Sequence, residues 1–133
     1  MIDVENWIFD PIAEAVRAEF PGSSVSGEYI RSPSKFPHIS LTESDNYMSE
    51  QYLDSSDAER YATVMYEVNV YSNKTTGKKA EARSILKLID SMMYERNFTR
   101  TAMTPVPNLE DSTIYRLTAR YRAVTDGTNM YRT

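Results

Sequence analysis

The sequence predicts an α+β fold with a single domain, residues 1–133, in which a mostly antiparallel sheet of about five strands carries two main helices on one face. Two observations favour this class. Apolar residues recur at helical spacing in residues 3–20 and 78–96, and they alternate with polar residues in residues 61–71 and 113–125. Strands that are polar on one side leave one face of a sheet to solvent or to a partner. The expected order of elements is α-β-β-β-α-β-β.

The first helix is expected over residues 3–20, where an apolar stripe recurs every four positions: Val4, Ile8, Ile12 and Val16. Pro11 lies inside this stretch, and proline lacks the N–H that an interior helical residue donates. The sequence therefore predicts either a kink at Pro11 or a main helix that begins at Asp10. Pro21 and Gly22 end the helix.

Two strands and a long loop are expected next. Residues 24–30 are a short strand candidate, and residues 36–43 alternate apolar and polar side chains, which is typical of a strand with one buried face. Residues 44–58 are polar and predict a long loop. Four larger side chains in this loop are candidate interface residues: Tyr47, Met48, Tyr52 and Leu53. They favour either a disordered loop or a contact arm that becomes ordered on assembly.

The alternation in residues 61–71 is the strongest strand signal and predicts a central strand. A helix over residues 78–96 follows, with apolar side chains on one stripe. Another strand is expected over residues 98–103. We expect Pro105 to stop it, because proline cannot take part in central pairing.

The last strand is expected over residues 113–125, before a flexible C-terminal tail at residues 126–133. Alternation places three arginines on one face of this strand: Arg116, Arg120 and Arg122. Glu67 and Asn69 are expected near them on a neighbouring strand. All five are candidate interface residues, because arginine is enriched where subunits meet. The alternative is a solvated sheet face with weak cross-strand ion pairs.

The composition disfavours several classes of function. The chain has no cysteine, which excludes disulfides, thiolate metal sites and cysteine nucleophiles. Its one histidine, His38, is expected to be structural, and we assign no catalytic, metal or cofactor site. A formal net charge of −4 disfavours general nucleic-acid binding. No apolar run is long enough to cross a membrane, and the N-terminus lacks signal-peptide features, so we expect a protein of the cytosol. Because we find no catalytic motif, we expect a protein that is not an enzyme.

Several stretches together resemble the tail terminator and tail-completion (head–tail joining) proteins of long-tailed phages and prophages. They read FPHISL at 36–41, VMYEVNVY at 64–71 and IYRLTARY at 114–121. Residues 64–79 and the run PVPNLEDSTIYR from 105 are particularly similar to prophage tail proteins of Gram-positive bacteria. The resemblance extends over nearly the whole chain. It lies in architecture more than in invariant residues, so it implies no residue-level site.

The resemblance implies a homo-hexameric ring that caps the tail tube, stops its polymerisation and joins it to the head connector. The implied partners are further copies of the chain, the tail tube protein and a head–tail connector or stopper protein, with no membrane and no cofactor. Six copies of a chain with a net charge of −4 carry −24 in total, so DNA would pass the channel as a non-specific occupant without sticking. The expected location is the tail or neck of the virion, and the host cytoplasm during assembly.

Three alternatives stay open from the sequence. A different neck component, such as a stopper, adaptor or minor tail protein, would belong to the same structural class. A small nucleic-acid-binding α+β module would use the arginine face and tyrosines for stacking. An enzyme would have to rely on paired Asp and Glu side chains, and none of these occurs at a spacing that such chemistry requires.

Overall fold

The computed structural model describes residues 1–48, 61–107 and 111–132. Within these ranges it contains two helices and a six-stranded sheet. In chain order the elements are α1 (Glu5–Glu19), β1 (Ser24–Ser26), β2 (His38–Met48), β3 (Ala62–Ser72), α2 (Lys78–Glu95), β4 (Thr99–Val106), β5 (Tyr115–Thr125) and β6 (Met130–Tyr131). The α+β class and the order predicted from the sequence are confirmed, and the short strand β6 is added at the end.

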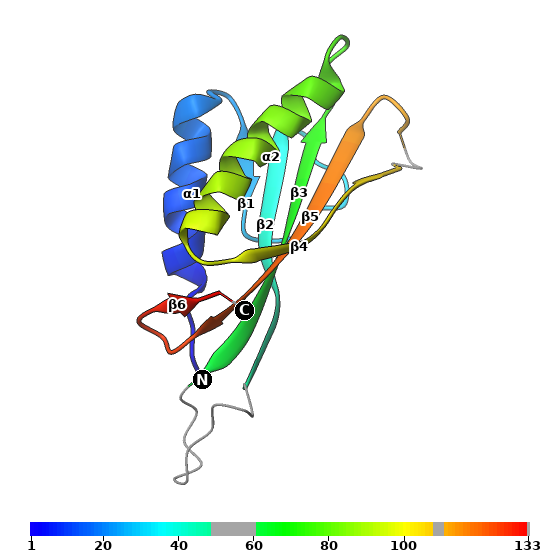
Figure 1. Cartoon of the computed structure of the whole chain (residues 1–133). Coiled ribbons are helices and arrows are strands. Elements are labelled where there is room, and N and C mark those ends of the chain that lie inside the picture. The colour runs from blue at the N-terminus through cyan, green and yellow to red at the C-terminus, as the bar shows by residue number, and fades with distance from the viewer. Residues whose placement is uncertain (49–60, 108–110, 133) are drawn as a thin grey trace, which may run out of the picture.

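The sheet has the strand order β1-β2-β3-β5-β4, and β6 pairs with the end of β5. Neighbouring strands are antiparallel except for β1, which runs parallel to β2. Strand β3 is therefore central, as its alternation predicted. Both helices lie on one face of the sheet, with α1 towards the β1 side and α2 across β3 and β5 (Figure 1). The connection between β1 and β2, residues 27–37, crosses the opposite face (Figure 1).

The core lies between the helices and the sheet. Alternate residues of β3 point towards the helices and are at most 1% exposed: Val64, Tyr66, Val68 and Val70. They belong to one apolar cluster with Ile8 and Ile12 of α1 and with Ile85 and Ile89 of α2. Full burial of each such side chain contributes roughly 1.5–3 kcal/mol. This packing holds both helices on the same face and leaves the other face open for contacts.

Helix α1 begins at Glu5 and continues through Pro11. The alternative in which the main helix begins at Asp10 is therefore wrong. Pro11 leaves the carbonyl of Trp7 without its helical partner. Because Trp7 is 49% exposed, this side of the helix gives the carbonyl access to water, while the buried Ile8 holds the first turns against the core.

Strand β2 continues to Met48, so residues 44–48, which were predicted as the start of a loop, are strand. A register shift within residues 43–45 interrupts the period-two alternation there, and the sequence pattern therefore shows no strand beyond it. Tyr47 lies in this strand rather than in an arm. The rest of the predicted loop falls outside the described residues, together with two of the candidate interface side chains: Tyr52 and Leu53.

Strand β4 is longer than the sequence predicted. It continues through Pro105, which pairs with Leu117 of β5, so the expected stop at this proline is wrong. Strand β4 is the last strand of the sheet, and proline is tolerated on an edge strand because one side of that strand needs no ladder partner.

The segment predicted as a flexible tail, residues 126–133, contains a turn and a short strand within residues 126–132. Residues Met130–Tyr131 form β6 against β5. The turn before β6 is fixed by Asp126, whose Oδ1 accepts hydrogen bonds from the backbone N–H groups of Thr128 and Asn129. These local bonds belong to the turn-forming chemistry of aspartate.

We expect Ile85→Ala to lower the free energy of unfolding by about 2–5 kcal/mol, because it empties a fully buried position of α2 and leaves a cavity. The control is Ser84→Ala, at an exposed position of the same helix, which should change this free energy by less than about 0.5 kcal/mol. Urea denaturation measures both values. Equal effects of the two substitutions would contradict the packing of α2 on the sheet.

Candidate functional site

The face of the sheet that points away from the helices, here called the open face, carries the predicted arginines. Strands β3 and β5 pair so that Glu67 lies opposite Arg120, Met65 opposite Arg122 and Tyr71 opposite Arg116. Asn69 lies opposite Thr118 in the same register. The sequence-based expectation that the three arginines share a face, next to Glu67 and Asn69, is confirmed. Their role in an interface stays a prediction.

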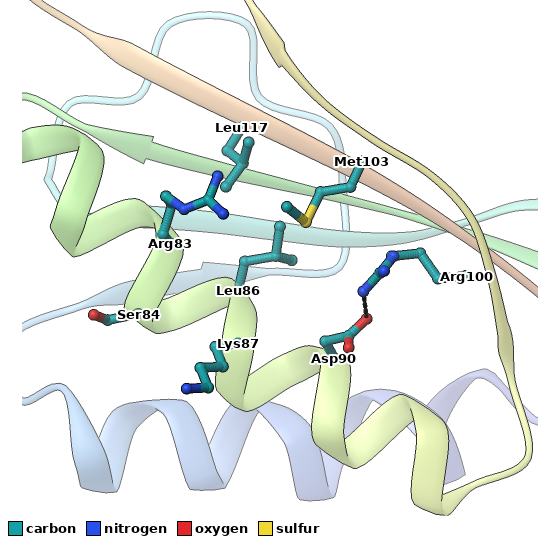
Figure 2. Close-up of a pocket in the computed structure, with 8 residues that line it drawn as sticks. All are labelled: Arg83, Ser84, Leu86, Lys87, Asp90, Arg100, Met103 and Leu117. Atoms are coloured by element: carbon teal, nitrogen blue, oxygen red, sulfur yellow. Dashed lines mark hydrogen bonds and ion pairs between the residues drawn. The ribbon is translucent and has the colours of Figure 1, made fainter.

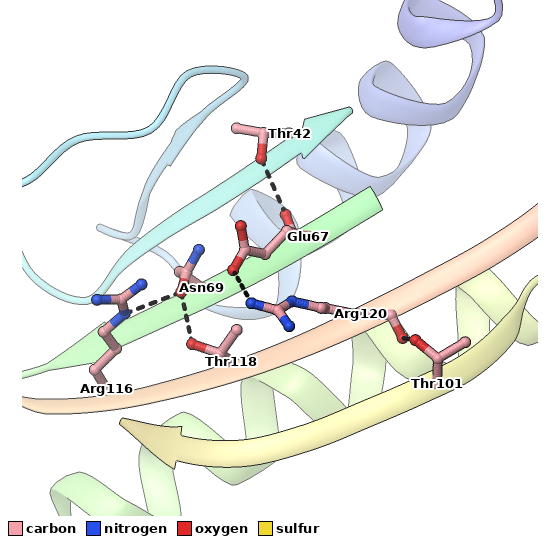
Figure 3. Close-up of polar contacts among 7 residues, drawn as sticks. All are labelled: Thr42, Glu67, Asn69, Thr101, Arg116, Thr118 and Arg120. Atoms are coloured by element: carbon pink, nitrogen blue, oxygen red, sulfur yellow. Dashed lines mark hydrogen bonds and ion pairs between the residues drawn. The ribbon is translucent and has the colours of Figure 1, made fainter. Parts of the chain in front are cut away.

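Asn69 is the polar centre of the open face. Its side chain is fully buried, and its Oδ1 accepts hydrogen bonds from Arg116 Nε at 3.0 Å and from Thr118 Oγ1 at 2.6 Å (Figure 3). Its Nδ2 has no hydrogen-bond partner among the described residues. Two donors of β5 therefore converge on one oxygen of β3, which fixes the side chain of Arg116 against the sheet.

A second polar contact joins Glu67 and Arg120, whose charged atoms lie 3.5 Å apart. The Arg120 side chain is 60% exposed, so this ion pair contributes little to stability. Threonines on the flanking strands extend the network: Thr42 Oγ1 donates to the Glu67 carbonyl at 3.4 Å and Thr101 Oγ1 to the Arg120 carbonyl at 3.3 Å (Figure 3). The network thus spans β2, β3, β5 and β4 in the middle of the open face.

One end of the open face is covered by residues 27–37. The guanidinium of Arg116 lies between two rings, with Cζ 5.7 Å from the ring centre of Tyr29 and 5.6 Å from that of Tyr71. Burial raises the pKa of Tyr71 to about 12, although the charge of Arg116 acts in the opposite direction. Arg116 therefore anchors the crossing segment to the sheet through Tyr29, in addition to its bond to Asn69.

His38 lies beneath the same segment, with its ring 6.0 Å from that of Tyr71. The residue is 2% exposed, and its Nε2 has no hydrogen-bond partner within the described part of the chain. Burial lowers the pKa of His38 below its ordinary value of 6.5, so the imidazole is neutral at neutral pH.

The other end of the open face is aromatic. A row across β2, β3, β5 and β6 is formed by register partners: Tyr47, Thr63, Val124 and Tyr131. The two outer residues of this row, Tyr47 and Tyr131, are 47% and 42% exposed, and the ring of Tyr61 lies 6.2 Å from that of Tyr131. Met48, the next residue of β2, lies opposite Ala62 and therefore on the helix side of the sheet, where it is 43% exposed. Large apolar side chains exposed this far from the core are typical of a contact surface.

The structure thus brings some candidate residues together and separates others. Arg116 is hydrogen-bonded to Asn69 and Arg120 is paired with Glu67 in the middle of the open face, whereas Tyr47 lies at the far end of this face and Met48 lies on the helix side of the sheet. Thr118 is absent from the predicted site, although its position between Arg116 and Arg120 in the alternation places it on this face. Tyr29 and Tyr131 are absent from it too, because their positions depend on a crossing segment and on a short strand that carry no periodic signal.

No protein-family model matches the chain, and no curated protein is significantly similar to it in sequence. Within the described ranges, no three His, Asp or Glu side chains gather where they could hold a metal ion. No helix in the same ranges is long and apolar enough to cross a bilayer.

We expect Asn69→Ala to lower the free energy of unfolding by about 1–3 kcal/mol, because it leaves the buried Thr118 donor and the partly buried Arg116 donor without their acceptor. Arg120→Ala should cost less than about 1 kcal/mol, since it removes only an exposed ion pair. Chemical denaturation of both variants and of the wild type makes the comparison. A larger loss for Arg120→Ala than for Asn69→Ala would contradict the central role of Asn69.

We expect the chain to become less stable as the pH falls below 6.5, with His38 as a cause. The pKa of His38 is lowered in the folded chain, so between that value and 6.5 the unfolded chain binds more protons. The stability that neutral His38 contributes is fully present above pH 6.5 and is lost as the pH falls towards the folded pKa. Urea denaturation between about pH 5 and 7 should show a weaker pH dependence for His38→Phe than for the wild type. Identical slopes would contradict this role.

Proposed function

We propose that this chain is a phage tail terminator, a structural protein that forms a ring, caps the tail tube, stops its polymerisation and joins it to the head connector. The likeness of residues 36–41, 64–79 and 105–121 to tail terminator and tail-completion proteins supports the proposal. The α+β fold, with its order α-β-β-β-α-β-β and its helices on one face, agrees with the architecture that this likeness implies.

The observation that carries the proposal is the construction of the open face. Its centre is held rigid by the buried Asn69, while Arg120, Tyr47 and Tyr131 present charge and aromatic surface to the outside. Tyrosine and arginine are among the residue types that contribute most to protein–protein contacts. A rigid sheet with such side chains is a docking surface that loses little conformational freedom when a partner binds.

The proposed mechanism is binding without chemistry. A ring stops a growing polymer when one of its faces copies the docking surface of the tube and the other face does not. Further tube subunits then find no complementary surface, and the second face is free for the connector or stopper protein. Each subunit must also offer two different patches to its two neighbours, because a ring is built from head-to-tail contacts.

The proposal competes with other roles. Another neck component, such as a stopper, adaptor or minor tail protein, would have the same fold, and its position in a virion would distinguish it. A nucleic-acid-binding role gains no support from the open face, because Arg116 is bonded to Asn69 and Arg120 is paired with Glu67. Phosphate binding relies on cations that are available for new contacts.

The proposal is tested by measuring the mass of the purified chain by light scattering over a range of concentrations, and by imaging it with tail tubes in negative stain. We expect a hexamer in solution, or rings that appear only at tube ends. Tubes incubated without the chain are the control for bare ends. A chain that stays monomeric and ignores the tubes would contradict the terminator proposal.

A further inference from the structure

The helix layer does not cover the whole sheet. Helix α1 lies towards β1 and α2 lies across β3 and β5, so the sheet beyond α2 has no helix above it (Figure 1). A groove of about 410 Å³ opens there, between α2 and the edge strand β4 (Figure 2). Its floor is apolar and is formed by three side chains: Leu86, Met103 and Leu117.

The groove carries two cations that no acidic side chain of the described residues neutralises. Arg100 is paired with Asp90 at 3.0 Å, and Asp90 also accepts a hydrogen bond from the Tyr121 hydroxyl at 2.8 Å. Arg83 and Lys87 are exposed and form no ion pair within the described part of the chain. Figure 2 shows Arg83 directed from α2 towards Met103 and Leu117. An occupant of this groove should therefore combine an apolar side chain with two negative charges.

The outer face of α1 has this composition. Trp7, Asp10 and Glu14 follow each other at helical spacing on the side opposite the buried stripe of the helix. Trp7 is 49% exposed, and neither carboxylate forms an ion pair within the described ranges. In its own chain, α1 lies on the other side of α2 from the groove, so it cannot fill it (Figure 1).

We propose that the outer face of α1 from one copy docks into the α2–β4 groove of the next copy. The two carboxylates would pair with the two cations of the groove, the docked helix would lie over the apolar floor, and Trp7 would cover the end of the groove beside Asp90 and Arg100. Asp10 and Glu14 are four residues apart, as are Arg83 and Lys87, so both pairs are separated by about 6 Å along their helices. The docked helix would continue the helix layer over the part of the sheet that is uncovered in a single copy.

This contact is head-to-tail, because it joins two different surfaces. Contacts of this kind close into rings when the rotation between neighbours is suitable. Helices α1 and α2 run in opposite directions within one copy (Figure 1), and side-by-side copies in a ring would keep this relation. Glu14 then faces Arg83 of the next copy, and Asp10 faces Lys87. The inference rests on the proposed function only for the ring; the contact itself is read from the two surfaces.

The test uses two charge-reversed variants of the full chain, D10K/E14K and R83E/K87E. Each alone should self-associate about 100-fold more weakly than the wild type in sedimentation experiments, because like charges then face each other. Mixed in equal amounts, they should assemble again: the reversed helix fits the reversed groove, and the native helix of one variant fits the native groove of the other. An interface elsewhere on the molecule would give no such rescue.

Two controls accompany this test. E28K/E95K changes exposed acids outside both surfaces and raises the net charge from −4 to zero, as D10K/E14K does, but it should assemble like the wild type. Circular dichroism checks that every variant is folded. Trp7 is the single tryptophan, so its fluorescence should shift to shorter wavelength when the wild type assembles and should shift in the mixture but not in either variant alone.

The outcomes separate this inference from the proposed function. Variants that assemble like the wild type would overturn the α1–groove contact and leave the terminator proposal standing. Rescue in the mixture, together with no binding to tail tubes, would support the contact and overturn the terminator proposal. A wild-type chain that is monomeric at every concentration and at tube ends would overturn both.

Discussion

The pairing of β3 with β5 is the constraint on which the rest of the molecule depends. The ladder runs without interruption from Ala62 opposite Thr125 to Ser72 opposite Tyr115. A strand has a side-chain period of two, so this register decides at once which side chains face the helices and which face outwards. A slip by one residue would turn Val68 out of the core and direct Asn69 into it. The apolar core and the polar network of the open face are therefore consequences of the same ladder.

Much of this arrangement follows from local sequence patterns. The fold class and the order of the elements follow from the helical stripes and from the alternation in residues 61–71 and 113–125. The same alternation identifies the sheet face that carries Arg116 and Arg120, because these patterns reflect which side chains are buried. Other features depend on what lies next to a segment in space. Pro105 is acceptable only because β4 is at an edge, and strand order cannot be obtained from local patterns. Likewise, the burial of Asn69 and His38 on a nominally solvated face is a tertiary feature that their neighbours in sequence do not encode.

The open face and the helix side of the sheet differ in how far their charged side chains already have partners within the described part of the chain. On the open face, Arg116 is held by its hydrogen bond to Asn69 and Arg120 by its ion pair with Glu67, so these side chains are already positioned within the chain. On the helix side, the layer stops short of β4 and leaves two cations, which have no ion pair among the described residues, above an apolar floor. A protein that assembles side by side needs such an incomplete edge, together with a matching surface on its other flank. Under the proposed function, the helix layer would organise contacts between copies, and the open face would be left for the tube or the connector.

The central claim, that copies join head-to-tail through α1 and the α2–β4 groove, is tested most directly by thiol cross-linking, since the chain has no cysteine of its own. The variant E14C/R83C, treated after assembly with a short bismaleimide that can span the positions of a Glu–Arg ion pair, should give a ladder of covalent oligomers that ends at the copy number of the ring. The single variants E14C and R83C should give none. A double variant that stays uncross-linked in assembled rings, or single variants that form dimers as efficiently, would contradict the account.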